Sequence, residues 1–126
     1  KFNTRDGKGF ELLRKAGIKT GIITSENTNI VLNRAKKLKV DFLYQGVEHN
    51  GKLDVVKKIC KSEKIDLENV AYIGDDLNCK ELLAAVGLAA CPYDATESVK
   101  NIPNIKVLTK KGGHGVVREI ADWIVG

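Results

Sequence analysis

The chain has 126 residues, which fits one domain, and 43% of them are apolar, which is enough to form a core. No apolar run approaches the roughly 20 residues that a membrane-spanning helix needs, so we expect no membrane association. The net charge is +5, but the lysines are spread over several segments and aromatic residues make up only 6%, so we expect no nucleic-acid partner.

Predicted strands and helices alternate along the chain. The helices are recognised by apolar residues three and four positions apart, and the strands by short apolar or β-branched runs. In chain order we expect a helix at 7–16, a strand at 20–24, a helix capped by Ser25 or Asn27 with Ile30, Val31, Ala35 and Leu38 on its apolar face, a strand at 42–45, a helix at 52–63, a strand at 70–74, a helix at 77–86, a strand at 88–91, a helix at 95–101, a strand at 106–109 and a helix at 115–125.

This alternation indicates an α/β fold in which right-handed crossover units build a parallel sheet that helices cover on both faces. We expect a Rossmann-like doubly wound sheet in a single domain that spans residues 1–126. In such a sheet the ligand site lies at the carboxyl ends of the strands. The loops that follow the strands are therefore where functional residues are expected.

Cysteine usage is sparse. Cys60, Cys79 and Cys91 are odd in number, and no CxxC pair occurs. The pattern suggests neither a zinc site nor a disulfide framework, and reduced thiols in a cytoplasmic protein are the simplest interpretation.

Two adjacent carboxylates, Asp75 and Asp76, follow an apolar strand and Gly74. Two acids at the end of a buried strand repel each other unless a positive charge lies beside them. A hard divalent cation such as Mg²⁺ takes oxygen ligands of this type. The alternative is that one of the two acids only caps the following helix.

A hydroxyl and an amine lie after two other predicted strands. Thr24 ends the strand Gly-Ile-Ile-Thr, where its hydroxyl and the free amides of the next helix could hold a phosphate oxygen, or where it could be a simple cap. Lys52 starts a helix after a glycine-containing loop. It could offset the charge of a phosphate and of carboxylates, or it could be an ordinary surface lysine.

The order of strand and threonine, lysine at a helix start, and strand and Gly-Asp-Asp resembles the haloacid dehalogenase superfamily. At closer range the chain resembles the 3-deoxy-octulosonate 8-phosphate phosphatase family, which includes the nonulosonate 9-phosphate phosphatases and the C-terminal module of some CMP-sialic acid synthetases. The resemblance covers essentially the whole chain. Its motifs are KFNTRDGKG at 1–9, RAKKL at 34–38, YQGV at 44–47, GDDLN at 74–78 and GGHGVVRE at 112–119.

The resemblance implies hydrolysis of a sugar phosphate through an aspartyl-phosphate, with Mg²⁺ bridging the phosphate and the carboxylates. Thr24 would match the hydroxyl that binds phosphate, and Lys52 the lysine that stabilises the nucleophile and the phosphate. Asp75 would match the metal-binding acid, with Asp76 supporting it.

The resemblance also implies residues that bind the sugar acid. Arg34 and Lys37, which lie on one helix turn close to the loop carrying Glu26, could meet its carboxylate, although all three could equally form a solvated helix face. The family is typically tetrameric, and Arg118, with the glycine-rich segment 112–115, would lie near the site of a neighbouring subunit.

The chain departs from the family pattern in its first strand. The nucleophile and general acid of the family lie in an Asp-x-Asp motif upstream of the residues that match Lys1, and no Asp-x-Asp occurs in these 126 residues. The sheet would therefore lack its first, central strand, which belongs between the strands ending at Thr24 and Gly74. Together with the absence of methionine, this favours a longer native protein and an inactive 126-residue chain.

Two further departures lie near the expected metal site. Cys79 stands where the family usually has a third acid, and a thiol is a soft ligand that cannot replace a carboxylate at Mg²⁺. The loop 46–52 is two residues longer than the usual path to the lysine, so the assignment of Lys52 assumes that the insertion bulges outward.

Two functions therefore stay open. The first is a Mg²⁺-dependent phosphatase of an octulosonate 8-phosphate or a nonulosonate 9-phosphate, in lipopolysaccharide sugar or sialic-acid biosynthesis. The second is a non-catalytic assembly module of an acylneuraminate cytidylyltransferase, which the altered residue 79 and the longer loop would suit.

Overall fold

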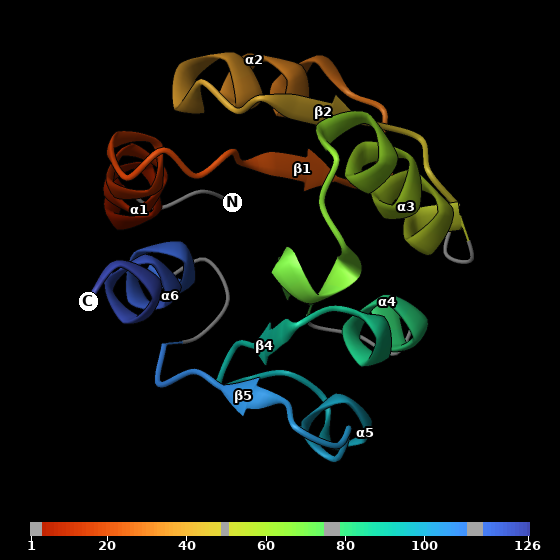
Figure 1. Ribbon diagram of the computed structural model, residues 1–126. Coiled ribbons are helices and arrows are strands. Elements are labelled where there is room, and N and C mark those ends of the chain that lie inside the picture. The colour runs from red at the N-terminus through yellow and green to blue at the C-terminus, as the bar shows by residue number, and fades with distance from the viewer. Residues whose placement is uncertain (1–3, 49–50, 75–78, 111–114) are drawn as a thin grey trace. The chain divides into compact units, whose positions relative to one another are not determined.

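The computed structural model describes residues 4–48, 51–74, 79–110 and 115–126 (Figure 1). The chain divides into two compact units, of which the first comprises Lys1–Val47 and Thr109–Gly126 and the second Glu48–Leu108. Asp75, Asp76 and the segment 112–114 lie outside the described residues. None of the helices within these ranges combines the length and the apolar character that crossing a membrane requires.

The first unit contains a pair of parallel strands and three helices. Gly21 pairs with Phe42 and Ile23 with Tyr44, so the two strands run side by side in register. The elements are α1 (Thr4–Lys15), β1 (Gly21–Ile23), α2 (Asn29–Leu38), β2 (Phe42–Tyr44) and α6 (Val116–Val125).

Helices α1 and α6 lie side by side in this unit, although they come from opposite ends of the chain (Figure 1). Phe10 and Leu13 of α1 and Ile120 of α6 are buried. A Cβ atom at Gly9 would lie 2.6 Å from the backbone nitrogen of Arg118 and from the carbonyl carbon of Val117. The absence of a side chain at Gly9 therefore lets the two helix backbones approach closely.

Helix α2 lies where the sequence predicts a helix, but its cap and part of its buried face differ from the prediction. The cap is Thr28, whose Oγ1 accepts a hydrogen bond from the Val31 backbone nitrogen at 3.2 Å, so the prediction of Ser25 or Asn27 is wrong. Val31 and Ala35 are buried as predicted, but Ile30 is 77% exposed.

The exposure of Ile30 follows from helix geometry. Val31, Ala35 and Leu38 are spaced by four and three residues and share one stripe of the helix. Ile30 is one position earlier, about 100° around the axis, and falls on the same stripe as Arg34 and Lys37.

The second unit contains a three-stranded parallel sheet in the order β3-β4-β5. Its core is formed by Cys79, Leu83, Ala89, Cys91, Ala95, Val99 and Ile102. The elements are α3 (Lys52–Glu63), the 3-10 helix η2 (Leu67–Asn69), β3 (Ala71–Ile73), α4 (Lys80–Ala85), β4 (Leu88–Cys91), α5 (Glu97–Lys100) and β5 (Lys106–Val107).

The predicted α/β fold with parallel strands is confirmed, and the helix at 52–63 and the strand at 88–91 have the predicted bounds. The strands form two sheets, one in each unit. In the described part of the chain β1 pairs only with β2, and β3 only with β4. The further strand expected between β1 and β3, and the single domain, stay predictions.

Candidate active site

Lys52 is the first residue of α3, and its side chain is half-buried. Its Nζ atom lies 3.8 Å from Sγ of Cys79, the residue that directly precedes α4. Cys79 also ends the loop that begins at Gly74 and carries Asp75 and Asp76. The amine of Lys52 therefore lies beside Cys79, and the assignment of Lys52 to the phosphate site stays a prediction.

The two ends of that loop meet inside the second unit. Gly74 continues the sheet, because its backbone nitrogen donates to the Ala90 carbonyl oxygen at 3.0 Å. A Cβ atom at Gly74 would lie 2.9 Å from Cβ of Cys79 and 3.2 Å from Cε2 of Tyr72. Only glycine fits this close approach, so Gly74 and Cys79 pack directly against each other.

The sulfur of Cys79 is in a polar contact on two sides. It lies 3.5 Å from the Tyr72 hydroxyl in addition to the Lys52 amine. A thiol is a soft ligand, and this one is occupied by two polar groups, so it does not fit Mg²⁺. Carboxylates fit Mg²⁺, and the predicted metal site therefore depends on Asp75 and Asp76. Within the described ranges no group of three His, Cys, Asp or Glu residues could hold a metal.

Thr24 belongs to the first unit and directly follows β1. Its backbone nitrogen donates to the Tyr44 carbonyl oxygen at 3.0 Å, which extends the pairing of β1 with β2. Its Oγ1 accepts a hydrogen bond from the Glu26 backbone nitrogen at 3.1 Å. This bond is the local turn that the sequence suggests, and it uses the oxygen only as an acceptor, so the hydroxyl hydrogen can still be donated.

The loop that follows Thr24 is tied to the loop that follows β2. The Val47 backbone nitrogen donates to the Thr24 carbonyl oxygen at 3.0 Å, and the Gly46 nitrogen to the Glu26 carbonyl oxygen at 3.0 Å. The Thr28 nitrogen donates to Oε1 of Gln45 at 3.0 Å. These bonds fix the backbone around Thr24 and Glu26.

The predicted sugar-acid residues of the first unit lie in this loop and on α2. Glu26 and Lys37 are exposed, and Arg34 is half-buried. Arg34 and Lys37 are three residues apart and share a face of the helix, as the sequence predicts. Lys52 and Cys79, in contrast, belong to the second unit.

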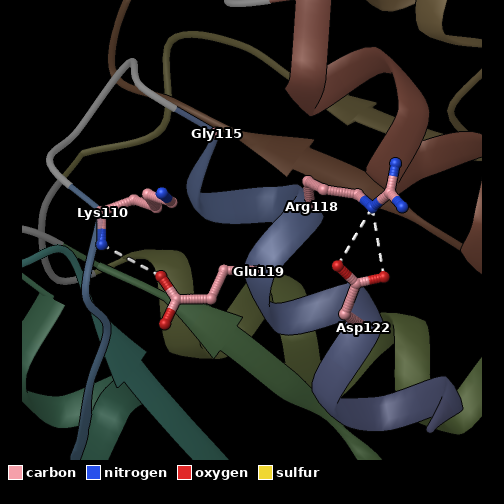
Figure 2. Close-up of a pocket in the computed structure, with 5 residues that line it drawn as sticks. All are labelled: Lys110, Gly115, Arg118, Glu119 and Asp122. Carbon is pink, nitrogen blue, oxygen red and sulfur yellow. Dashed lines mark hydrogen bonds and ion pairs between the residues drawn. The ribbon is translucent and has the colours of Figure 1, made fainter.

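Figure 2 shows a pocket of about 320 Å³ at the start of α6, lined by Lys110, Gly115, Arg118, Glu119 and Asp122. Nε of Arg118 lies 3.1 Å from both carboxylate oxygens of Asp122, one helical turn away. This ion pair uses Nε, so the two terminal amino groups of the guanidinium can serve another anion.

Glu119 of the same pocket binds the backbone. Its carboxylate accepts a hydrogen bond from the Thr109 nitrogen at 2.9 Å. It accepts another from the Lys110 nitrogen at 3.0 Å (Figure 2). Burial raises the pKa of Glu119, but these backbone hydrogen bonds, the Thr109 side chain and the charge of Lys110 together hold the pKa below the ordinary value. The sequence prediction singled out Arg118 and missed Glu119, although both belong to the motif GGHGVVRE.

Known proteins share both the sequence and the fold. Residues 46–120 match the family model of the haloacid dehalogenase-like hydrolases. Over 125 residues the chain is 37% identical to the 3-deoxy-D-manno-octulosonate 8-phosphate phosphatase KdsC of Yersinia pestis. The alignment covers 98% of this chain, which spans about 65% of the length of that relative.

Two crystal structures extend the comparison. The octulosonate 8-phosphate phosphatase from Yersinia pestis is 36% identical, with a TM-score of 0.92 over 98% of this chain and 65% of that chain. The same phosphatase from Moraxella catarrhalis, in complex with magnesium, phosphate and a KDO molecule, is 32% identical, with a TM-score of 0.91 over 98% of this chain and 70% of that chain. The chain therefore belongs to the haloacid dehalogenase-like hydrolases, in the 3-deoxy-D-manno-octulosonate 8-phosphate phosphatase family.

Proposed function

We propose that the native protein is a Mg²⁺-dependent phosphatase that hydrolyses the phosphate ester of a sugar acid, either an octulosonate 8-phosphate or a nonulosonate 9-phosphate. The observation that carries this proposal is the position of Lys52. Its amine lies 3.8 Å from the sulfur of residue 79, at the end of the loop with the two aspartates. The complex of the Moraxella catarrhalis relative with magnesium, phosphate and KDO supports the same ligands here.

Different residues of this chain would bind the metal and the phosphate. Asp75 would hold Mg²⁺ with the support of Asp76, and the bound ion would draw negative charge from the phosphate. The Lys52 ammonium would offset the charge that develops on the phosphate oxygens, and the Thr24 hydroxyl would donate to one of them. The nucleophilic acid is expected outside these residues, because no Asp-x-Asp occurs among them.

The sugar acid would be held by charges outside the phosphate site. Arg34 and Lys37 would meet its carboxylate, and Glu26 its hydroxyl groups. Arg118 has amino groups beyond its contact with Asp122, and we propose that it serves the site of a neighbouring subunit in a homotetramer. A guanidinium suits this task because it binds a carboxylate through two parallel hydrogen bonds.

The decisive experiment measures phosphate release by the full-length native protein with Mg²⁺, from 3-deoxy-octulosonate 8-phosphate and from a nonulosonate 9-phosphate. We expect turnover with one of them and a loss of at least about 100-fold in Asp75→Ala, since that change removes a charged metal ligand. Turnover by the native protein that is no greater than that of Asp75→Ala would rule out the enzyme. We expect no turnover from the 126 residues by themselves.

One observation favours a second candidate, the non-catalytic assembly module of an acylneuraminate cytidylyltransferase. Residue 79 is a buried cysteine whose sulfur contacts Lys52 and Tyr72, rather than an acid. For this candidate we expect a nucleotidyltransferase region in the native protein and no phosphate release from either substrate. Turnover that depends on Asp75 would rule it out.

A further inference from the structure

The amine of Lys52 meets a chain of two polar groups in the second unit. Its Nζ lies 3.8 Å from Sγ of Cys79, and that sulfur lies 3.5 Å from the hydroxyl of Tyr72. The three residues come from the start of α3, the residue before α4 and the middle of β3. The contact joins residues that are 27 positions apart in the chain, so the fold brings them together.

Cys79 has a fixed position in the core, whereas a lysine side chain is long and flexible. Cys79 is only 4% exposed and belongs to the core cluster of its unit. A Cβ atom on Gly74 would lie 2.9 Å from Cβ of Cys79, so the cysteine is packed directly against the start of the aspartate loop. The sulfur therefore gives the amine a defined place beside that loop.

The partner of the Lys52 amine at residue 79 is a thiol rather than a carboxylate. Among the residues that the structure describes, no carboxylate lies within ion-pair distance of Lys52. A thiol accepts a weak hydrogen bond from an ammonium but does not neutralise it. The contact with Cys79 by itself therefore leaves the positive charge of Lys52 for an anion.

We infer that Cys79 is a positioning residue, whose thiol holds the Lys52 ammonium in the place where it binds the phosphate group of the substrate. This inference rests on the proposed phosphatase function, since it assigns the anion that Lys52 meets. It gives residue 79 a role toward the lysine rather than toward the metal.

The test measures the affinity of inorganic phosphate by calorimetry, on the full-length native protein with saturating Mg²⁺. The variants are Cys79→Ala and Cys79→Ser, each with the native Lys52 and with Lys52→Met. With Lys52 present, Cys79→Ala should weaken phosphate binding about fivefold, the loss of one modest hydrogen bond. Cys79→Ser keeps a polar acceptor and should remain within about twofold of the parent. With Lys52→Met, Cys79→Ala should have no further effect.

Lys80→Met is the matched control, because Lys80 is an exposed lysine next to Cys79 that no described contact ties to the loop. It should bind phosphate as the parent does, and thermal unfolding shows whether each variant is folded. A Cys79→Ala loss of the same size with Lys52→Met would overturn the inference, because the effect would then not pass through the lysine. Parent-like binding by a folded Cys79→Ala, or no phosphate binding by the parent, would also overturn it.

These results are separate from those for the proposed function. If the phosphate affinities follow the expected pattern but neither sugar-acid phosphate is hydrolysed, the positioning role stands and the phosphatase assignment fails. If hydrolysis occurs but substitution of Cys79 does not change the phosphate affinity, the proposed phosphatase function is supported and the positioning role is refuted.

Discussion

Glu119 is a carboxylate whose partners are backbone groups. It accepts from the Thr109 and Lys110 nitrogens, which lie shortly before the glycine-rich segment. It neighbours Arg118 on α6, and Figure 2 shows it with Lys110 and Arg118. An ionised carboxylate forms stronger hydrogen bonds with backbone N–H groups than a neutral acceptor does. Glu119 therefore ties the chain that leads into the glycine-rich segment to the helix that carries Arg118.

The lowered pKa of Glu119 gives this bond a pH dependence. Since the folded pKa lies below the unfolded value of about 4.3, the stabilisation is fully present above the unfolded value and is lost as the pH falls through the folded one. We expect Glu119→Gln to lower the free energy of unfolding by about 1 kcal/mol at pH 7. The difference from the parent should shrink below about pH 4.

Urea unfolding of both proteins at pH 7 and at acid pH measures this difference. Asp122→Asn is a suitable control, because Asp122 forms an exposed ion pair with Arg118. Exposed pairs contribute little, so that change should cost less than about 0.5 kcal/mol. An equal cost of Glu119→Gln at both pH values would contradict the role of its charge.

At the scale of elements, the close approach of α1 to α6 depends on one glycine. Gly7 and Gly9 both lie within α1, yet their surroundings differ. Among the described residues, a Cβ atom at Gly7 would come within 4 Å of Cδ2 of Leu38 alone, at 3.8 Å, which is an ordinary contact. At Gly9 it would meet the backbone of α6 at 2.6 Å, which cannot yield without moving the helix.

We therefore expect opposite effects from the same substitution in the same helix. Gly9→Ala should lower the free energy of unfolding by about 1–3 kcal/mol, because overpacking outweighs the helical preference of alanine. Gly7→Ala should leave it unchanged or raise it by up to about 1 kcal/mol. Thermal and urea unfolding of the two variants measure this, and a Gly9→Ala protein as stable as Gly7→Ala would contradict the close packing of α1 against α6.

At the scale of the whole molecule, the proposed Mg²⁺ site predicts that metal binding stabilises the native protein, because an ion at Asp75 would bind the folded state and offset the repulsion between two neighbouring acids. At 100 times the dissociation constant, Mg²⁺ should add about 2.7 kcal/mol to the free energy of unfolding. Removal of the ion with EDTA should lower the melting temperature accordingly.

Asp75→Asn should abolish this dependence on Mg²⁺, whereas Asp54→Asn, at an exposed acid in the first turn of α3, should preserve it. Scanning calorimetry of the three proteins with and without Mg²⁺ gives the comparison. A Mg²⁺-dependent shift that persists in Asp75→Asn would exclude Asp75 as the metal ligand.

The sequence by itself determined the class of fold and the family. Apolar periodicity is local, so it was sufficient to predict the parallel strands, the bounds of α3 and β4 and the buried Val31 and Ala35. Glycines, acids and the lysine at strand ends are also local signals, and their order along the chain was enough to point to the phosphatase family that the comparisons confirm.

Only the tertiary structure decided which side chains meet. In the sequence, Cys79 indicated only that the family's usual third acid is absent. In the structure, its sulfur lies beside the amine of Lys52, which is 27 residues away in the chain. The sequence predicted Ile30 as a core residue. The packing of α2 decides which of its faces is buried, and this packing leaves Ile30 exposed. Glu119 carried no signal of its own, because its partners are backbone groups that any sequence possesses. Such contacts depend on distances in space between residues far apart in the chain. A periodic pattern describes only neighbouring residues and therefore does not predict these contacts.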